Sequence, residues 1–190
     1  MSRKVKVRAK PDPYLTGIEE AGKRQAQAHA SVCLLSIDPG INGTGWALWR
    51  NQTLKKAGII RVAKRGMDWR EKSLEVAREV SVLVATHRVA AVACEYPEYM
   101  QSQKGEMVAR RGDLVKLAFL TGVIAGRCCP LDAAMVPVHM WKGQLSKENV
   151  ERRIRRILTR EEGYDICGLL DLKSHMWDAV GVGLFMQGRF

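Results

Sequence analysis

A short apolar run that stops at an acidic turn constrains this chain more than any other feature. Residues 32–37 read Val-Cys-Leu-Leu-Ser-Ile, and Asp38-Pro39-Gly40 follows at once. A run of this length is typical of a buried strand, and Asp-Pro-Gly favours a turn. Thr44–Trp49 is a second apolar run, and the glycines between the two runs allow a tight connection. The ordered part of the chain is therefore predicted to open with a strand hairpin.

Strand and helix patterns alternate along the rest of the chain. Thr53–Val62 adds a third strand, which makes an antiparallel trio. Asp68 and Glu71 then form a capping-box pattern ahead of apolar residues at helical spacing. Further elements are expected, in order, as a strand at Val89–Cys94, a helix at Glu106–Arg127, a strand at Ala133–Val138, and helices at Lys147–Arg160 and Ser174–Gln187, with Gly163 ending the first of these two helices.

This order predicts an α/β fold with one five-stranded mixed sheet flanked by helices, in which three antiparallel strands precede two parallel ones. Residues 31–190 are expected to form this domain, since 190 residues leave little room for a second one. Residues 1–30 are rich in Lys, Arg, Gln and Ala, and we expect a basic, flexible tail there. The tail either adds phosphate contacts or has no role in binding.

The charge of the chain narrows the class of partner. Lys and Arg number 31 against 20 Asp and Glu, for a net charge of +11 at pH 7. Such an excess favours a polyanion, nucleic acid before membrane. No apolar run reaches the ~18 residues of a membrane span. The five cysteines form no CxxC pair, which argues against a zinc site and for a reducing compartment. A cytoplasmic location, in a bacterium or a phage-infected host cell, is expected.

Two carboxylates stand where apolar strands end: Asp38 after the first strand and Glu95 after the fourth. A right-handed crossover makes these strands parallel, so as neighbours they would present both acids at one edge of the sheet. His175 and Asp178 share a face in the first turn of the last predicted helix. Three carboxylates and an imidazole suit Mg²⁺ or Mn²⁺, and two such ions could support phosphodiester hydrolysis.

Each of these residues also has an ordinary structural interpretation. Asp38 could simply form a turn, and Asp178 could be an acid that favours a helix N-terminus. His175 could pack against the core or cap a helix. Glu95 is harder to explain in this way, because a glutamate at the end of a core strand rarely lacks a partner. It is the joint placement of the four that favours a catalytic site.

With these residues in view, the chain resembles the RuvC family of Holliday-junction resolvases, in the ribonuclease-H-like superfamily. Ser36-Ile-Asp-Pro-Gly40, followed by Thr44-Gly45, is similar to the first family motif, and Ala93-Cys-Glu95 is similar to the second. Trp141-Lys-Gly, with Lys147 opening a helix, is similar to the basic third segment. His175-Met-Trp-Asp178 is similar to the terminal acid pair, whose first position is commonly Asp.

The resemblance covers about residues 32–186 and implies a ribonuclease-H-like fold and a homodimer that nicks opposing strands of a four-way DNA junction. It implies that Asp38, Glu95, His175 and Asp178 are the catalytic, metal-binding set. It implies that Lys142 and Lys147 contact phosphate and that Tyr99 stacks on a base. Basic residues flanking the polar loop after Glu95 are expected to clamp the substrate; they are Lys104, Arg110 and Arg111.

Some features leave the substrate and the assembly open. The long tail and the Pro97-Glu98 insertion in the second motif depart from the family pattern, and such departures are expected of a divergent, phage-type member. Such members cut branched DNA more broadly. Three glycines between residues 112 and 126 permit close helix approach, either in a dimer or against the chain's own sheet.

Two other functions fit parts of the sequence. An actin-like or sugar-kinase-like nucleotide binder also holds phosphate with an Asp-x-Gly hairpin, but it needs two such domains. A non-catalytic nucleic-acid-binding protein would keep the fold without the metal site, yet Asp, Glu, His and Asp stand at the four positions. The nuclease interpretation requires no membrane and no small-molecule cofactor, and EDTA-sensitive DNA cleavage separates the three.

Overall fold

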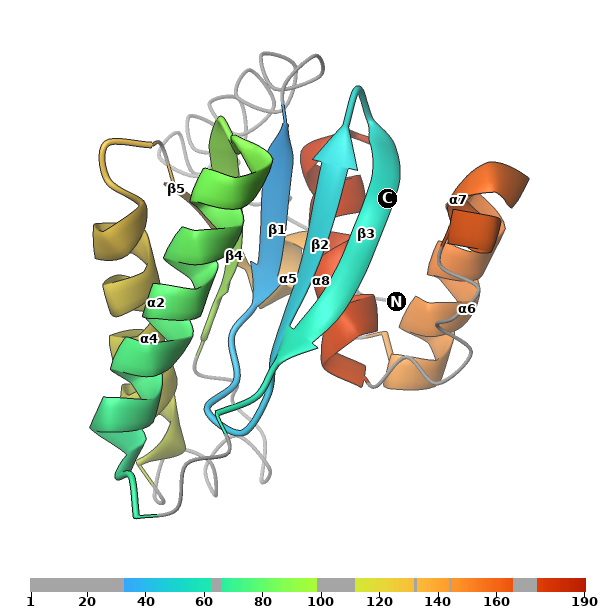
Figure 1. The fold of residues 1–190 in the computed structure, drawn as a ribbon. Helices are drawn as coiled ribbons and strands as arrows, with labels where there is room; N and C mark the ends of the chain where they lie inside the picture. Colours follow the sequence, from blue (N-terminus) through green and yellow to red (C-terminus); the bar gives the residue numbers. More distant parts are fainter. Residues whose placement is uncertain (1–32, 63–65, 99–111, 132, 144, 166–173) are drawn as a thin grey trace, which may run out of the picture.

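The computed structural model describes residues 33–62, 66–98, 112–131, 133–143, 145–165 and 174–190. The expected N-terminal tail lies outside these residues. Five strands form one sheet in the order β3-β2-β1-β4-β5 (Figure 1). The strands are β1 (Leu34–Asp38), β2 (Thr44–Arg50), β3 (Thr53–Ile60), β4 (Ala91–Tyr96) and β5 (Ala133–Pro137).

The pairing within the sheet confirms the predicted mixed topology. β1 pairs antiparallel with β2, and β2 pairs antiparallel with β3. β4 lies parallel to β1 on the other side, and β5 lies parallel to β4. β1 and β4 are therefore parallel neighbours, which is the arrangement that the predicted proximity of Asp38 and Glu95 depends on.

Helices cover both faces of the sheet (Figure 1). α2 (Trp69–His87) and α4 (Asp113–Cys128) lie on one face. α8 (Ser174–Met186), α5 (Val138–Trp141) and α6 (Lys147–Ile157) contribute to the core on the other face, and α7 (Arg160–Asp165) packs beside β3. None of the helices among the described residues is long and apolar enough to cross a membrane.

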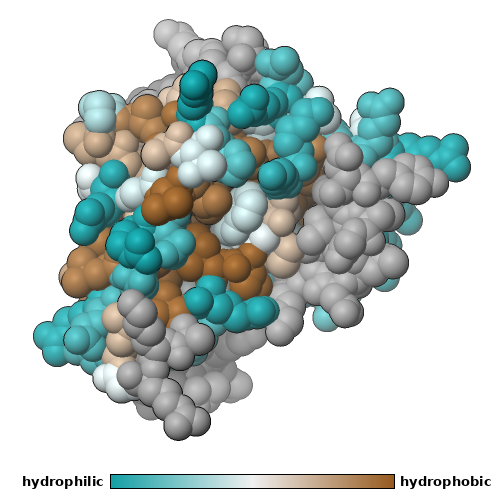
Figure 2. All heavy atoms as spheres, in the orientation of Figure 1, coloured by the Kyte–Doolittle hydropathy of each residue, from teal (hydrophilic) through white to brown (hydrophobic). Residues whose placement is uncertain are grey.

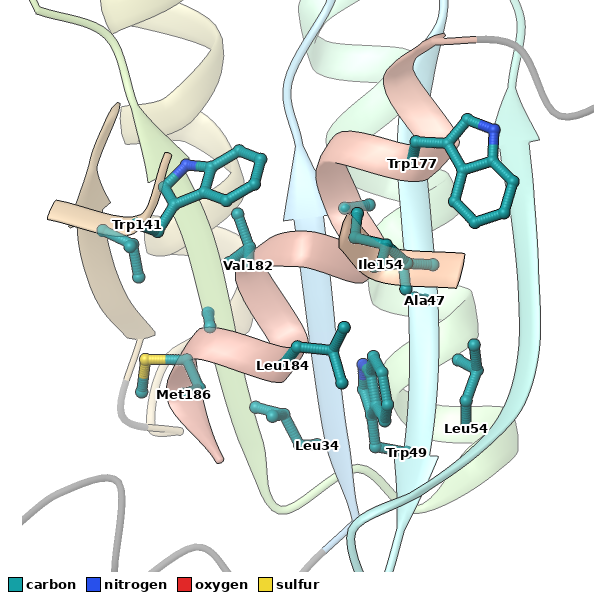
Figure 3. Close-up of a cluster of buried hydrophobic side chains, with 14 of the residues drawn as sticks. Leu34, Ala47, Trp49, Leu54, Trp141, Ile154, Trp177, Val182, Leu184 and Met186 are labelled. Atoms are coloured by element: carbon teal, nitrogen blue, oxygen red, sulfur yellow. The ribbon is translucent and has the colours of Figure 1, made fainter. Parts of the chain in front are cut away.

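Alternation along the strands divides the core into two layers. Leu35 and Ile37 of β1 point to the layer under α2 and α4, whereas Leu34 points to the layer under α8. The layer under α8 is rich in tryptophan; Trp49 and Leu184 pack together there beside β1 and β2 (Figure 3). Ser36 lies on the same face of β1 as Leu34. By the same alternation Asp38, two residues further on, also points to the face under α8.

The position of α8 is fixed by one buried hydroxyl and two glycines. Ser36 Oγ donates to the Ala179 carbonyl oxygen at 2.8 Å and accepts from Trp49 Nε1 at 2.9 Å, which joins β1, β2 and α8. A Cβ at Gly45 would collide with the backbone of α8, and a Cβ at Gly183 would collide with the Trp49 indole. Close packing of α8 across β1 and β2 therefore depends on both glycines.

Two short helices depart from the prediction. The helix expected at Lys147–Arg160 ends at Ile157, and α7 begins at Arg160 and contains Gly163, which was expected to end a helix. A capping box explains the break: Thr159 Oγ1 accepts from the Glu162 backbone N–H at 3.3 Å, and a Glu162 carboxylate oxygen accepts from the Thr159 N–H at 2.8 Å. α5 was not predicted; it follows Pro137, whose extended backbone ends β5.

Candidate functional site

Asp38 and Glu95 lie level with each other on neighbouring parallel strands. The β1–β4 register pairs Ile37 with Cys94, so the next residue of each strand is an acid. Both acids were expected just after their strands, but both lie within them. Asp38 is the last residue of β1, and Glu95 pairs with Val136 of β5, one residue before β4 ends. By strand alternation both side chains share the α8 face of the sheet.

α8 brings the second pair of predicted residues to the same place. His175 Nδ1 lies 2.6 Å from an Asp38 carboxylate oxygen, although 137 positions separate the two residues. Asp178 follows one turn later and is 7% exposed. Its expected place in the first turn of the helix is wrong, because α8 begins at Ser174 and carries no acid in its first turn. The favourable interaction of an acid with a helix N-terminus therefore does not explain Asp178.

α5 and the residue that follows it contribute two side chains that close the cluster. Trp141 Nε1 donates to Glu95 Oε2 at 2.9 Å. The Lys142 ammonium donates to the same oxygen at 3.4 Å and to Asp178 Oδ2 at 3.2 Å. Trp141 is 3% exposed, and only a glycine at position 181 of α8 leaves room for its indole. The structure thus assigns Trp141 a contact with the site that sequence reasoning missed.

The signal for Trp141 was present in the Trp-Lys-Gly motif, where only the lysine had been given a role. Tryptophan has a single donor, and a buried indole N–H needs an acceptor. A tryptophan directly before a predicted site lysine is therefore a candidate for positioning an acid.

Burial and mutual repulsion perturb the acids. Burial raises the pKa of Glu95 to about 8, and the nearby Asp38 adds to the rise. The pKa of Asp38 is also raised, first by burial and then by Asp178, although the hydrogen bond with His175 opposes the rise. Carboxylates in this condition favour a cation among them, because a cation removes the repulsion between the ionised forms.

The acids of the cluster shift the pKa values of its two basic groups, His175 and Lys142. The hydrogen bond to Asp38 raises the pKa of His175. Burial acts to lower the pKa of Lys142, but Glu95 and Asp178 outweigh it, so that this pKa is raised. Lys142 therefore stays charged between the two carboxylates at neutral pH.

The donor set fits a hard divalent cation in its chemistry. Asp38, Glu95 and Asp178 supply carboxylate oxygens and His175 supplies an imidazole nitrogen, which are ligands that Mg²⁺ or Mn²⁺ accept. Within the described ranges, however, no three His, Cys, Asp or Glu side chains are arranged closely enough to hold a metal as they stand. Lys142 lies against Glu95 and Asp178, and His175 lies against Asp38, so both groups would have to move.

The predicted DNA-binding residues fall into two groups. Lys142 faces the carboxylates rather than open solvent, with an 18% exposed side chain. Lys147 begins α6 behind the Ser146 cap and is near enough to His175 to act on its pKa. The others lie outside the described residues; they are Tyr99, Lys104, Arg110 and Arg111.

Glu98, a further acid near the site, has a separate partner. His139 Nδ1 lies 2.8 Å from each Glu98 carboxylate oxygen, and the His139 backbone N–H donates to Oε2 at 3.1 Å. Glu98 therefore ties the end of β4 to the start of α5 instead of joining the cluster.

Three comparisons with known proteins bear on the fold. No protein-family model matches the sequence, and no curated protein matches it. Solved structures do match: RuvC from Thermus thermophilus has a TM-score of 0.55 at 18% identity, over 83% of this chain and 95% of that one. The same RuvC in complex with a Holliday junction substrate has a TM-score of 0.51 at 15% identity, with the same coverage.

A eukaryotic structure matches as well. The yeast mitochondrial Holliday junction resolvase Ydc2 has a TM-score of 0.58 at 11% identity, over 90% of this chain and 86% of that one. This chain has the ribonuclease-H-like fold. The predicted fold class is thereby confirmed, and at these identities the likeness concerns the fold alone.

Proposed function

We propose that this protein is a divalent-metal-dependent endonuclease that cuts four-way or related branched DNA. The observation that carries the proposal is the convergence of three carboxylates and a histidine, from β1, β4 and α8, on one edge of the sheet. The net charge of +11 supports a polyanionic substrate, and RuvC and Ydc2, whose fold this chain shares, are Holliday junction resolvases.

The proposed chemistry divides between the side chains. Asp38, Glu95, His175 and Asp178 would hold one or two Mg²⁺ or Mn²⁺ ions. When bound, such ions activate a water and stabilise the leaving oxygen of a phosphodiester. Trp141 holds the Glu95 carboxylate in place through its indole N–H. Lys147, at the start of α6 beside His175, is placed to neutralise a phosphate of the DNA backbone.

The test is cleavage of a synthetic four-way junction beside a flap, a fork and a linear duplex, with Mg²⁺, Mn²⁺ or EDTA. Paired symmetric nicks in the junction would support a resolvase, and cuts in several branched substrates a broader nuclease. Asp38→Asn is expected to lower the cleavage rate by roughly 10³-fold while junction binding persists. Wild-type rates in this variant would refute the site, and binding without metal-dependent cutting by the wild type would favour the non-catalytic alternative.

The outer face of α4 supports the proposed homodimer. Val115 is 67% exposed and Phe119 is 38% exposed on α4, and Leu74 and Val82 are exposed apolar residues of the neighbouring helix α2. Figure 2 shows hydrophobic side chains among hydrophilic ones on the side of the molecule that α2 and α4 cover. A Cβ added at Gly122 or Gly126 of α4 would meet nothing within 4 Å among the described residues, so these residues give no reason for glycine at either position within one subunit.

Sedimentation velocity tests the dimer directly. The wild type is expected to sediment as a dimer and Val115→Glu as a monomer, because the charge would be buried in the interface. Leu145→Glu, an exposed apolar position away from α4, is the control and is expected to leave the dimer intact. A monomeric wild type would contradict the proposal. The expected cytoplasmic location stays a prediction.

A further inference from the structure

Lys142 faces protein acids where a DNA-contacting lysine would be expected to face solvent. Its ammonium lies 3.4 Å from Glu95 Oε2 and 3.2 Å from Asp178 Oδ2. The Lys142 side chain is 18% exposed, and those of Glu95 and Asp178 are 13% and 10% exposed. The ammonium also lies 4.7 Å from the centre of the Trp141 ring. Lys142 is thus enclosed by two carboxylates and an aromatic face, which are all groups that attract a cation.

The ammonium occupies the lone pairs that a metal ion would need. Glu95 Oε2 and Asp178 Oδ2 are the atoms that Lys142 contacts, and both residues belong to the proposed ligand set. A divalent ion bound there would lie beside a positive charge in a poorly hydrated site, where repulsion is strong. Without either cation, the ionised forms of these two acids would have no positive partner in the cluster. An ammonium and a metal ion are therefore alternative occupants.

We propose that Lys142 is a resident cation that holds Glu95 and Asp178 in place until a divalent ion displaces it, and that the displaced ammonium then contacts DNA phosphate. This inference rests on the proposed function, since it requires the cluster to bind metal. The lysine side chain is flexible and carries a compact charge, which suits exchange between two anionic partners. Gly143 follows directly, with a left-handed φ of 54°, where α5 has already ended.

Exchange of this kind couples two binding events. The ammonium becomes available to a phosphate only after the metal has taken its place between the acids. Trp141 keeps its hydrogen bond to Glu95, so one carboxylate stays oriented while the lysine leaves. DNA would then bind productively to the metal-loaded protein and less well to the metal-free one.

Metal titration by calorimetry, without DNA, tests the competition. Lys142→Met keeps the length of the side chain and removes its charge, and it is expected to bind Mn²⁺ or Mg²⁺ at least about tenfold more tightly than the wild type. Lys147→Met removes the same charge near the site without freeing Glu95 or Asp178, and a change of less than about threefold is expected. Lys142→Gln is a second variant with the charge removed, for use if the first folds poorly.

A labelling experiment on the wild type avoids any folding problem. Lys142 is expected to react slowly with an amine-acylating reagent in EDTA and several-fold faster with Mg²⁺, as read by peptide mass spectrometry. Lys56, an exposed lysine of β3, serves as the internal reference. In Asp178→Asn the rate at Lys142 should no longer respond to Mg²⁺.

The outcomes separate the two proposals. The resident-cation proposal fails if wild type and Lys142→Met bind metal equally well, or if the labelling rate of Lys142 is the same with EDTA and with Mg²⁺. Neither result contradicts the metal site itself. If the wild type and both Lys142 variants bind no metal, the metal site fails, and the proposed nuclease with it. Tighter binding by Lys142→Met together with metal-dependent labelling supports both.

Discussion

Two buried glutamates of this protein lie in opposite electrostatic surroundings. Glu162 is 1% exposed; burial would raise its pKa, but hydrogen bonds from Arg189 and from the Leu54 and Thr159 backbones hold it at about 2. Glu95 accepts one indole N–H and a longer contact from Lys142, faces other acids, and has its pKa raised to about 8. Glu162, with its hydrogen-bond donors, contributes to the fold, whereas Glu95 costs stability, a cost that the proposed metal site would explain.

The ion pair of Glu162 connects segments that are distant in sequence. Arg189 donates to both Glu162 oxygens at 2.8 Å and also to the Gln52 carbonyl oxygen. The edge strand β3 gains a partner for the Leu54 N–H at 3.0 Å. These contacts attach the C-terminal segment to β3 and α7.

The largest stability effect is expected at this ion pair. Glu162→Gln should destabilise the protein by about 3 kcal/mol, because it leaves the part-buried Arg189 charge without its anion. The pKa is depressed, so this contribution is present above the ordinary value of 4.5 and is lost as the pH falls towards 2. Urea unfolding at pH 7 measures the effect. Glu161→Gln, an exposed neighbour, is the control, and equal losses in the two variants would contradict the assignment.

Removing the charge of Glu95 is expected to change the stability of the protein in the opposite direction and by a smaller amount. Its pKa is raised, so stability falls as the pH rises from the ordinary value of 4.5 to about 8. In EDTA, Glu95→Gln should therefore stabilise the protein by roughly 1–2 kcal/mol at pH 8 and by almost nothing at pH 4. Thermal unfolding at the two pH values measures this difference. A variant less stable than wild type at pH 8 would make Glu95 a structural acid like Glu162.

The smallest expected effect concerns the histidine of the cluster. Oxygen ligands suit Mg²⁺ better than an imidazole does, so His175→Asp should shift the Mn²⁺/Mg²⁺ ratio of cleavage rates towards Mg²⁺ by roughly fivefold. His139→Asn, whose side chain pairs with Glu98 outside the cluster, is the control. An unchanged ratio in His175→Asp would mean that His175 orients Asp38 and does not bind metal.

The sheet could be predicted because its signals are local. Each strand is a short apolar run with its own turn signal, and the capping box of Asp68 and Glu71 places the start of α2. α7 carries an equally local signal in Thr159-x-x-Glu162, but Gly163 was interpreted as the end of the preceding helix. A glycine inside a six-residue helix costs about 1 kcal/mol, which the contacts of Glu162 offset here.

For the candidate site, the sequence predicts that the acids and the histidine lie near one another, but it does not predict the contact of Trp141. Strand order places Asp38 beside Glu95, and helix periodicity places His175 beside Asp178. The partner of Lys142 could not be predicted in this way, because a flexible side chain can face phosphate or protein, and only the three-dimensional arrangement of α5 and α8 decides.

The docking of α8 has a consequence for when the acid cluster can form during protein synthesis. His175 is synthesised 137 residues after Asp38. At translation rates of about 5–20 residues per second, the delay is on the order of ten seconds. The strands β2 to β5 are completed within this interval, but the helix that completes the acid cluster is still missing. Under the proposed function, a ribosome-bound chain is therefore expected not to cut DNA until α8 has been synthesised and has docked on the sheet.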